Sequence, residues 1–232
     1  MVIFLCSWHY FTVIYLLIIK FYPNRKKIKN VFVKLIKLNR LKSGIVYLQV
    51  TRGVQSRDHA YIDNLKPNLI IYIQKRQLNI PNKNFSGKKA ITFEDLRWKR
   101  RDIKTVSLLG NVIAKNEAVK RNAFEAILVE KGKVTEATSS NVWIVKNNKL
   151  ITHPANTDIL KGITSEAIKN IIKKNKLKLL EKIFTTTEMY KADEVFITSS
   201  GNLLTPIIKI DSILINKGKI GDITLQLALL YA

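Results

Sequence analysis

Residues Val134–Val142 have the sequence VTEATSSNV, in which the carboxylate of Glu136 precedes a turn of small hydroxylated residues that leads into a strand. We expect this strand at Asn141–Val145, joined through a turn at 147–148 to a second strand at Leu150–Thr152 as a hairpin. Short strands joined in this way, with few helices between them, indicate an α+β or barrel-like domain and argue against regular βαβ repeats.

A basic run with the sequence RWKRRDIK lies upstream, at Arg97–Lys104. Lys104 closes this run just before a leucine-rich segment. A lysine nucleophile needs a depressed pKa, which both desolvation and neighbouring cations provide. Lys104 has candidates for both effects and is therefore a candidate nucleophile. Taken alone, the run fits a solvated, charged face of the protein better.

Downstream, residues Leu160–Ser165 have the sequence LKGITS, which predicts a helix that starts at Gly162 and runs to about Lys174. The backbone N–H groups and the dipole at a helix start attract phosphate groups. Taken alone, the motif fits better a structural role in which the hydroxyl group of Thr164 or Ser165 caps the helix.

An extended segment, YLQVTRGVQSRDH, occupies Tyr47–His59 and predicts a strand that leads into a loop. Alternate residues of an extended loop point the same way, so Arg57 and His59 could both face one carboxylate. By itself, this Arg-x-His triplet fits a solvated loop better.

The first third of the chain contains a predicted helix and two predicted strands. Apolar positions at helical spacing predict a helix over Lys29–Leu41, and β-branched and aromatic runs predict strands at Ile45–Thr51 and Leu69–Gln74. The polar stretch Leu78–Lys89 reads as a linker, which places a domain boundary near residue 80.

Further along, residues Ser107–Asn122 suit a helix. We expect its large apolar side chains to face inward; these are Leu108, Leu109, Val112 and Ile113. Additional strands are expected at Ala126–Glu130, before a turn at 131–133, and at Glu194–Thr198.

Composition limits the classes of function. The chain has 232 residues, a hydrophobic fraction of 47% and a formal net charge of +23. The basic residues are spread along the chain without an arginine-rich tract, so we interpret them as a solvated surface and not as a nucleic-acid site. One cysteine, Cys6, and three scattered histidines exclude an internal disulfide framework and give no metal-ligand spacing. A reducing, cytoplasmic setting is expected.

The N-terminal run Met1–Ile19 is almost wholly apolar, and basic residues follow it. Its length and hydropathy could span a bilayer. It does not fit a cleavable signal peptide, because no basic segment precedes it and no small-x-small site follows it. A third interpretation, an altered start of the chain, is favoured by the comparison with a known family.

Together, these stretches resemble the fold-type IV aminotransferases, which include D-amino-acid transaminases, branched-chain aminotransferases and aminodeoxychorismate lyases. The resemblance runs from about residue 30 to the C-terminus and is closest to the D-amino-acid transaminases. It rests on an ordered set of segments, QVTRG with a following Arg-x-His, RW…DIK, TE…SSN and LKGIT, to which Phe196–Ser200 and Thr205-Pro206 add.

The resemblance implies pyridoxal 5'-phosphate as the cofactor and implies two residues that act on it directly. Lys104 matches the lysine that binds this cofactor covalently and moves the proton at the substrate α-carbon. Glu136 matches the acid beside the pyridine nitrogen, where a carboxylate keeps that nitrogen protonated and the ring able to accept electrons.

The other implied roles concern the phosphate and the substrate. Ile163 and Thr164 match the helix start that receives the cofactor phosphate, and a second phosphate-side segment matches Ser199 and Ser200. In D-specific members the substrate α-carboxylate is bound by two residues that Arg57 and His59 match.

Three departures from the family pattern stand out. Trp143 replaces the usual Phe or Tyr, and Ser165 replaces the usual Lys or Arg. Residues 1–28 do not resemble the first part of the family's small domain, which supplies a substrate-site tyrosine and a phosphate-binding arginine. We therefore expect an altered or truncated start at 1–22, a remnant of the small α/β domain at 23–79, and a larger, barrel-like cofactor-binding domain at 80–232.

The resemblance implies a D-amino-acid transaminase, a homodimer, that moves the amino group of D-alanine or a similar D-amino acid to a 2-oxo acid such as 2-oxoglutarate. The alternatives within the family are a branched-chain aminotransferase and an aminodeoxychorismate lyase. Outside it, they are an inactive truncated relic and a membrane-anchored basic binding protein. An altered start predicts weak cofactor retention, low activity, and an unpaired sheet edge along Ile45–Thr51 unless the apolar run Met1–Ile19 covers it.

Overall fold

The computed structural model describes residues 2–3, 24–76, 80 and 85–231. The chain divides into two compact units, an N-terminal unit at Met1–Leu78 and a C-terminal unit at Asn79–Ala232. Apart from Val2–Ile3, the apolar run Met1–Ile19 lies outside the described residues. Within the described ranges, no helix has the length and apolar character needed to cross a membrane.

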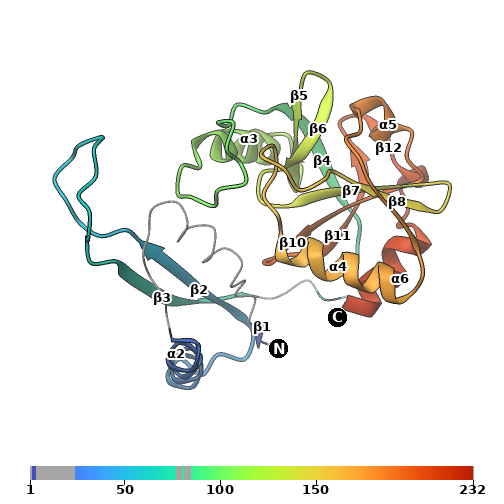
Figure 1. Ribbon diagram of the computed structural model, residues 1–232. Coiled ribbons are helices and arrows are strands. Elements are labelled where there is room, and N and C mark those ends of the chain that lie inside the picture. Colours follow the sequence, from blue (N-terminus) through green and yellow to red (C-terminus); the bar gives the residue numbers. More distant parts are fainter. Residues whose placement is uncertain (1, 4–23, 77–79, 81–84, 232) are drawn as a thin grey trace. The chain divides into compact units, whose positions relative to one another are not determined.

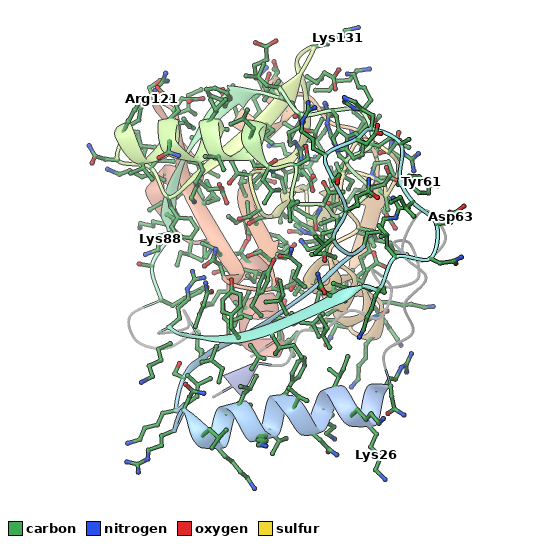
Figure 2. All side chains as sticks on the ribbon, turned by 90° about the vertical axis from the view of Figure 1, so that its left-hand side faces the viewer. Lys26, Tyr61, Asp63, Lys88, Arg121 and Lys131 are labelled. Atoms are coloured by element: carbon green, nitrogen blue, oxygen red, sulfur yellow. The ribbon has the colours of Figure 1, made fainter. Side chains whose placement is uncertain are left out.

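The N-terminal unit combines one helix with a three-stranded sheet in the order β1-β2-β3. Strand β2 (Gly44–Thr51) pairs antiparallel with β3 (Asn68–Lys75) along its whole length, from Gly44↔Lys75 to Thr51↔Asn68. These two strands confirm the predicted ones. Figure 2 shows Tyr61 and Asp63 on the long loop that connects them.

Helix α2 (Arg25–Leu38) begins four residues before the predicted start. Its N-cap is Asn24, whose side-chain Oδ1 accepts a hydrogen bond from the Lys27 backbone N–H at 3.1 Å. Asparagine is among the best N-cap residues because its side chain satisfies an N–H group that lacks a partner within the helix. Ile28 and Phe32 form the buried stripe of the helix.

The expected unpaired edge of β2 is partly covered. Strand β1 (Val2–Ile3) pairs with it in parallel, Val2 opposite Gly44 and Ile3 opposite Ile45. Of the two alternatives for this edge, coverage by the apolar N-terminal run applies at the start of β2, because Val2 and Ile3 supply backbone partners there.

The C-terminal unit is built on a mixed nine-stranded sheet in the order β6-β5-β4-β11-β10-β7-β8-β9, with β12 paired to β11. Figure 1 shows this sheet curled into a half-barrel, which confirms the predicted barrel-like domain. The strands are β4 (Lys88–Glu94), β5 (Glu125–Glu130), β6 (Lys133–Ala137), β7 (Asn141–Lys146), β8 (Lys149–Thr152), β9 (Lys178–Glu181), β10 (Glu194–Ser199), β11 (Leu203–Ile210) and β12 (Ile213–Leu214).

Helices cover both faces of this sheet. Those in the unit are α3 (Leu109–Lys120), α4 (Ile163–Lys174), α5 (Thr186–Tyr190), a short 3-10 turn at Asn216–Gly218 and α6 (Asp222–Tyr231). Helices α4 and α6 pack on β7, β8, β10 and β11, where Trp143 stacks on Phe196 with ring centroids 5.6 Å apart. Each fully buried large side chain of this kind contributes roughly 1.5–3 kcal/mol to folding.

Most predicted elements of this unit are confirmed. Strands β7 and β8 form the expected hairpin, with Lys146 opposite Lys149 across the turn at 147–148. Helix α4 runs from Ile163 to Lys174 as predicted. Figure 2 shows Lys131 at the tip of the expected turn between β5 and β6.

The predicted linker extends too far. Strand β4 begins at Lys88, and its Ala90 and Ile91 are buried. It pairs in parallel with both β5 and β11. A central parallel strand is covered on both faces and does not alternate between apolar and polar residues, so the run AITF shows no strand period.

The position of helix α3 matches the prediction, but its buried face does not. Ala114 and Ala118 are its buried residues. The larger side chains expected inside are exposed instead, with fractions from 44% to 73%: Leu108, Leu109, Val112 and Ile113. The short alanine side chains allow a close approach to Ala126 and Leu128 of β5, and this close contact decides which face is buried.

Candidate active site

Glu136 is the buried charge at the centre of the candidate site. It lies on β6, and its residue is 4% exposed. Arg97 Nη1 donates to Oε1 at 2.5 Å, while Asn141 Nδ2 and the Leu160 backbone N–H donate to Oε2 at 3.2 and 3.1 Å. Both carboxylate oxygens therefore accept hydrogen bonds from three separate segments of the chain.

Burial raises the pKa of Glu136 to about 7, against the opposing effects of Arg97 and of the Leu160 N–H. A carboxylate in low-dielectric surroundings binds its proton more tightly because its charge is poorly solvated. Near neutral pH, an additional positive charge beside Glu136 would therefore strongly stabilise its ionised form. A protonated ring nitrogen is a charge of that kind.

Arg97 is held by a second carboxylate, Asp95. Its Nε and Nη2 donate to Asp95 Oδ1 and Oδ2 at 2.9 and 2.8 Å, a bidentate pair, and Thr135 Oγ1 donates to Oδ2 at 2.7 Å. Burial alone would lower the pKa of Arg97, but its bonds to Asp95 and the charge of Glu136 raise it overall. Asp95 is not among the predicted site residues, although it stands two positions before Arg97.

Lys104 lies on the loop between β4 and α3. The residue is exposed, yet its ammonium group is closely surrounded by protein, and this desolvation lowers the pKa of Lys104. The charge of Glu136 acts in the opposite direction and raises it. The two predicted cofactor residues are therefore close enough to interact electrostatically.

A buried arginine anchors the segment that leads to Lys104. The Arg101 backbone N–H donates to Thr157 O at 2.9 Å, and its Nη1 forms an ion pair with Glu130 Oε2 at 2.9 Å. These contacts tie the segment to β5 and to the loop before α4. A single sequence shows only a charge run here, and it does not reveal that Arg101 is buried.

The start of α4 is the segment predicted to receive the cofactor phosphate. Its N-cap is Gly162, with no side-chain cap hydrogen bond. The alternative in which Thr164 or Ser165 caps the helix is therefore wrong. Both residues lie inside the helix and are buried, while Ile163 is half-buried.

Ser199 ends β10 and Ser200 follows in the turn. Pairing of β10 with β7 sets Thr198 opposite Asn141, so Ser199 lies beside the turn that follows Glu136. Two contacts fix this corner: Trp143 Nε1 donates to Thr198 Oγ1 at 3.1 Å, and the Asn202 N–H donates to Ser199 Oγ at 3.1 Å. The indole of Trp143 makes a bond that phenylalanine could not make.

Arg57 and His59 lie in the N-terminal unit, on the exposed loop between β2 and β3. The side chain of Gln55 closes this loop, donating to Ala60 O and accepting from the Ile62 N–H, each at 3.0 Å. The loop is therefore ordered by its own bonds. The structure does not place the two residues relative to Glu136, because they belong to the other unit.

Across the part of the chain that the structure describes, no cluster of three or more His, Cys, Asp or Glu side chains could hold a metal ion. The candidate site consists of the buried Glu136, the desolvated Lys104 and the start of α4. Arg97, Asn141 and the Leu160 backbone join the site through Glu136.

The chain matches known proteins over most of its length. The family model for amino-transferase class IV covers residues 14–210. A D-alanine aminotransferase of Listeria monocytogenes is 43% identical over 206 residues, which are 88% of this chain and 71% of the relative. One of Staphylococcus aureus is 40% identical over 195 residues, 84% of this chain and 69% of the relative.

A solved structure shows the same fold. The branched-chain amino acid aminotransferase of Thermobaculum terrenum, in its PLP-form, superposes with a TM-score of 0.81 at 23% identity. The match covers 96% of this chain and 74% of that one.

Proposed function

The chain belongs to the class IV aminotransferases, and from that membership we propose that it transfers the amino group of D-alanine or a similar D-amino acid to a 2-oxo acid such as 2-oxoglutarate. The observation that carries the proposal is the buried carboxylate of Glu136, bonded by three donors and within electrostatic reach of Lys104. The relatives named D-alanine aminotransferase support D-alanine as the amino donor.

Pyridoxal 5'-phosphate fits the residues of this site. Glu136 offers a buried negative charge for the protonated ring nitrogen, and the start of α4 offers N–H groups without a side-chain cap for the phosphate. Ser199 and Ser200 add hydroxyl donors beside the turn that follows Glu136. When bound, the cofactor supplies an electron sink that stabilises negative charge at the substrate α-carbon.

Lys104 carries the proton chemistry in this proposal. Desolvation lowers its pKa, so a larger fraction of the side chain is a neutral amine near pH 7. The neutral amine would take the proton from the α-carbon of the amino donor and donate it to the bound cofactor, and the reverse transfer would deliver a proton to the α-carbon of the 2-oxo acid. Glu136 keeps the charge that draws electrons away from that carbon.

The proposal is tested by comparing two amino donors. The purified chain, supplied with pyridoxal phosphate and 2-oxoglutarate, should turn over D-alanine much faster than L-leucine. A clear preference for L-leucine would instead make the protein a branched-chain aminotransferase. A chain that binds no pyridoxal phosphate in equilibrium dialysis, even at high cofactor concentration, would contradict the proposal as a whole.

Arg57 and His59 are proposed to bind the substrate α-carboxylate, and Arg57→Ala tests this role. The variant should raise KM about ten- to hundredfold for every amino-acid substrate, because all of them present the same carboxylate and a charge-assisted bond is worth about 1.5–3 kcal/mol. Lys66→Ala removes an exposed positive charge from the same loop and is the matched control. A change confined to the preference among substrate side chains would rule out carboxylate binding.

We propose that the chain acts as a homodimer in the cytoplasm. The exposed apolar side chains of α3 support this, because Leu109, Val112 and Ile113 form an aliphatic stripe while the helix buries only alanines. Contiguous exposed apolar side chains typically mark an interaction surface.

Ile113→Lys should convert the dimer to a monomer, because the ammonium group would be buried without a partner. Sedimentation equilibrium measures the mass directly. Leu229→Lys on α6 provides a matched exposed aliphatic position and should leave the mass unchanged. A wild-type chain that is monomeric at all concentrations, or a dimer that tolerates Ile113→Lys, would contradict the proposed interface.

A further inference from the structure

The side-chain amide of Asn141 joins two parts of the candidate site. Its Nδ2 donates to Glu136 Oε2 at 3.2 Å and to the carbonyl oxygen of Leu160 at 2.8 Å. The same Oε2 accepts the backbone N–H of Leu160 at 3.1 Å. Carboxylate, amide and backbone thus close a small ring of bonds between β6, the start of β7 and the loop before α4.

This arrangement fixes the orientation of the amide. Both partners of Nδ2 are acceptors, so only the NH₂ end of Asn141 can face them. The oxygen end, Oδ1, then points to Gly162, where a β-carbon would lie 2.1 Å away. Gly162 has a φ of −71°, which any residue can adopt. The glycine is therefore required there for space.

We infer that Asn141 is a positioning residue that holds the Glu136 carboxylate in register with the start of α4, and that Gly162 makes room for it. The carboxylate beside the cofactor ring and the helix start at its phosphate are then set at a fixed separation by one amide. The inference rests on the proposed function only for the identity of the group that occupies the site; the bonds themselves do not depend on it.

The ring of bonds also acts on the charge of Glu136. A hydrogen bond donated to a carboxylate favours its ionised form. Asn141 is one of three donors to Glu136, and its loss leaves Glu136 Oε2 and Leu160 O each with one hydrogen-bond donor fewer. Removal of the amide should therefore make Glu136 harder to ionise and should loosen the loop before α4.

The test follows the titration of Glu136 directly. The side-chain carboxyl carbons of glutamate are labelled with ¹³C in the cofactor-free chain, and Glu136→Gln assigns the resonance. Asn141→Ala should raise the titration midpoint of Glu136 by about one pH unit, a tenfold change in proton affinity. Gly162→Ala should shift it in the same direction, because the added methyl group displaces the amide.

A double variant distinguishes the bond from a general disturbance of the loop. In the Asn141→Ala background the space beside residue 162 is open, so adding Gly162→Ala should produce no further shift. Residues that act through one contact are expected to be non-additive in this way. Two independent, additive shifts would show that Gly162 affects Glu136 by another route and would overturn the inference.

Asn111→Ala is the matched control. Asn111 Nδ2 also donates to a backbone carbonyl of this unit, Thr138 O, at 2.7 Å, but it has no bond to Glu136. Its loss should lower the unfolding temperature and leave the midpoint of Glu136 in place. If Asn141→Ala behaved in the same way, lowering stability without moving the midpoint, Asn141 would be structural only.

Cofactor binding supplies a second readout. The dissociation constant for pyridoxal phosphate, measured by equilibrium dialysis, should rise about tenfold in both single variants. The reason is that the Glu136 carboxylate and the start of α4 are then no longer held at a fixed separation. Unchanged affinity in both would contradict the inference. A wild-type chain that binds no pyridoxal phosphate would contradict the proposed function instead, while a shifted titration would still support the role of Asn141 toward Glu136.

Discussion

Lys104→Ala is expected to abolish the covalent, borohydride-reducible attachment of pyridoxal phosphate and to lower the rate of transamination by a factor on the order of 10² to 10⁴. The lysine has two tasks in the proposed mechanism, attachment of the cofactor and transfer of the α-proton. Alanine can perform neither. Because the residue is exposed overall and lies on a loop, the fold should be retained without its side chain.

Peptide mapping of the borohydride-reduced protein measures the attachment site. Lys99→Ala is the matched control, since Lys99 belongs to the same basic run but forms an ion pair with Glu130 and is 72% exposed at the side chain. It should retain both attachment and activity. Recovery of the label on any lysine other than Lys104 would refute the assignment.

The strands and the hairpin could be predicted because their signals are local. The turn at 147–148 and the β-branched runs on either side of it define β7 and β8 without reference to the rest of the chain. The face of α3 could not be predicted, because burial there depends on which side chains fit against β5. Two alanines fit closely, and the apolar stripe that usually marks the buried face is outside.

In the candidate site, too, some features could be predicted from the sequence and others could not. The positions of Glu136 and Lys104 follow from a family resemblance in ordered segments, and the structure brings them within electrostatic reach of each other. The supporting residues do not follow from it. Arg101 belongs to a run that fits a charged surface in the sequence, and Asp95 lies just before this run, whereas the fold buries both. Burial of a charge is decided by distant segments, so a single sequence gives no direct sign of it.

The electrostatics of Glu136 give a pH dependence with a definite sign. Its pKa is raised to about 7 in the folded protein, above the ordinary value of 4.5 that applies to the unfolded chain. The folded state therefore holds the proton more tightly. Its contribution to stability is fully present below pH 4.5 and is lost as the pH rises through 7. The full shift corresponds to about 3 kcal/mol for the cofactor-free protein.

Glu136→Gln should separate two effects of this carboxylate, the loss of folding stability as the pH rises and its contribution to the rate of transamination. Transamination should fall roughly a hundredfold or more, because loss of the charge beside the ring nitrogen removes a few kcal/mol of stabilisation. The variant should still fold and bind cofactor. The cofactor-free protein should no longer lose stability between about pH 5 and pH 8 through this group, because glutamine does not titrate.

The amide of glutamine at position 136 must turn its NH₂ end toward one of the donors that now bond the carboxylate, Arg97 or the pair formed by Asn141 and Leu160. That mismatch adds a cost that does not vary with pH, so the slope of stability against pH is the informative quantity. Urea unfolding of both proteins at about pH 5 and pH 8 measures it. A variant that keeps the wild-type slope would show that another group titrates in this range, and a fully active variant would show that another acid serves the ring nitrogen.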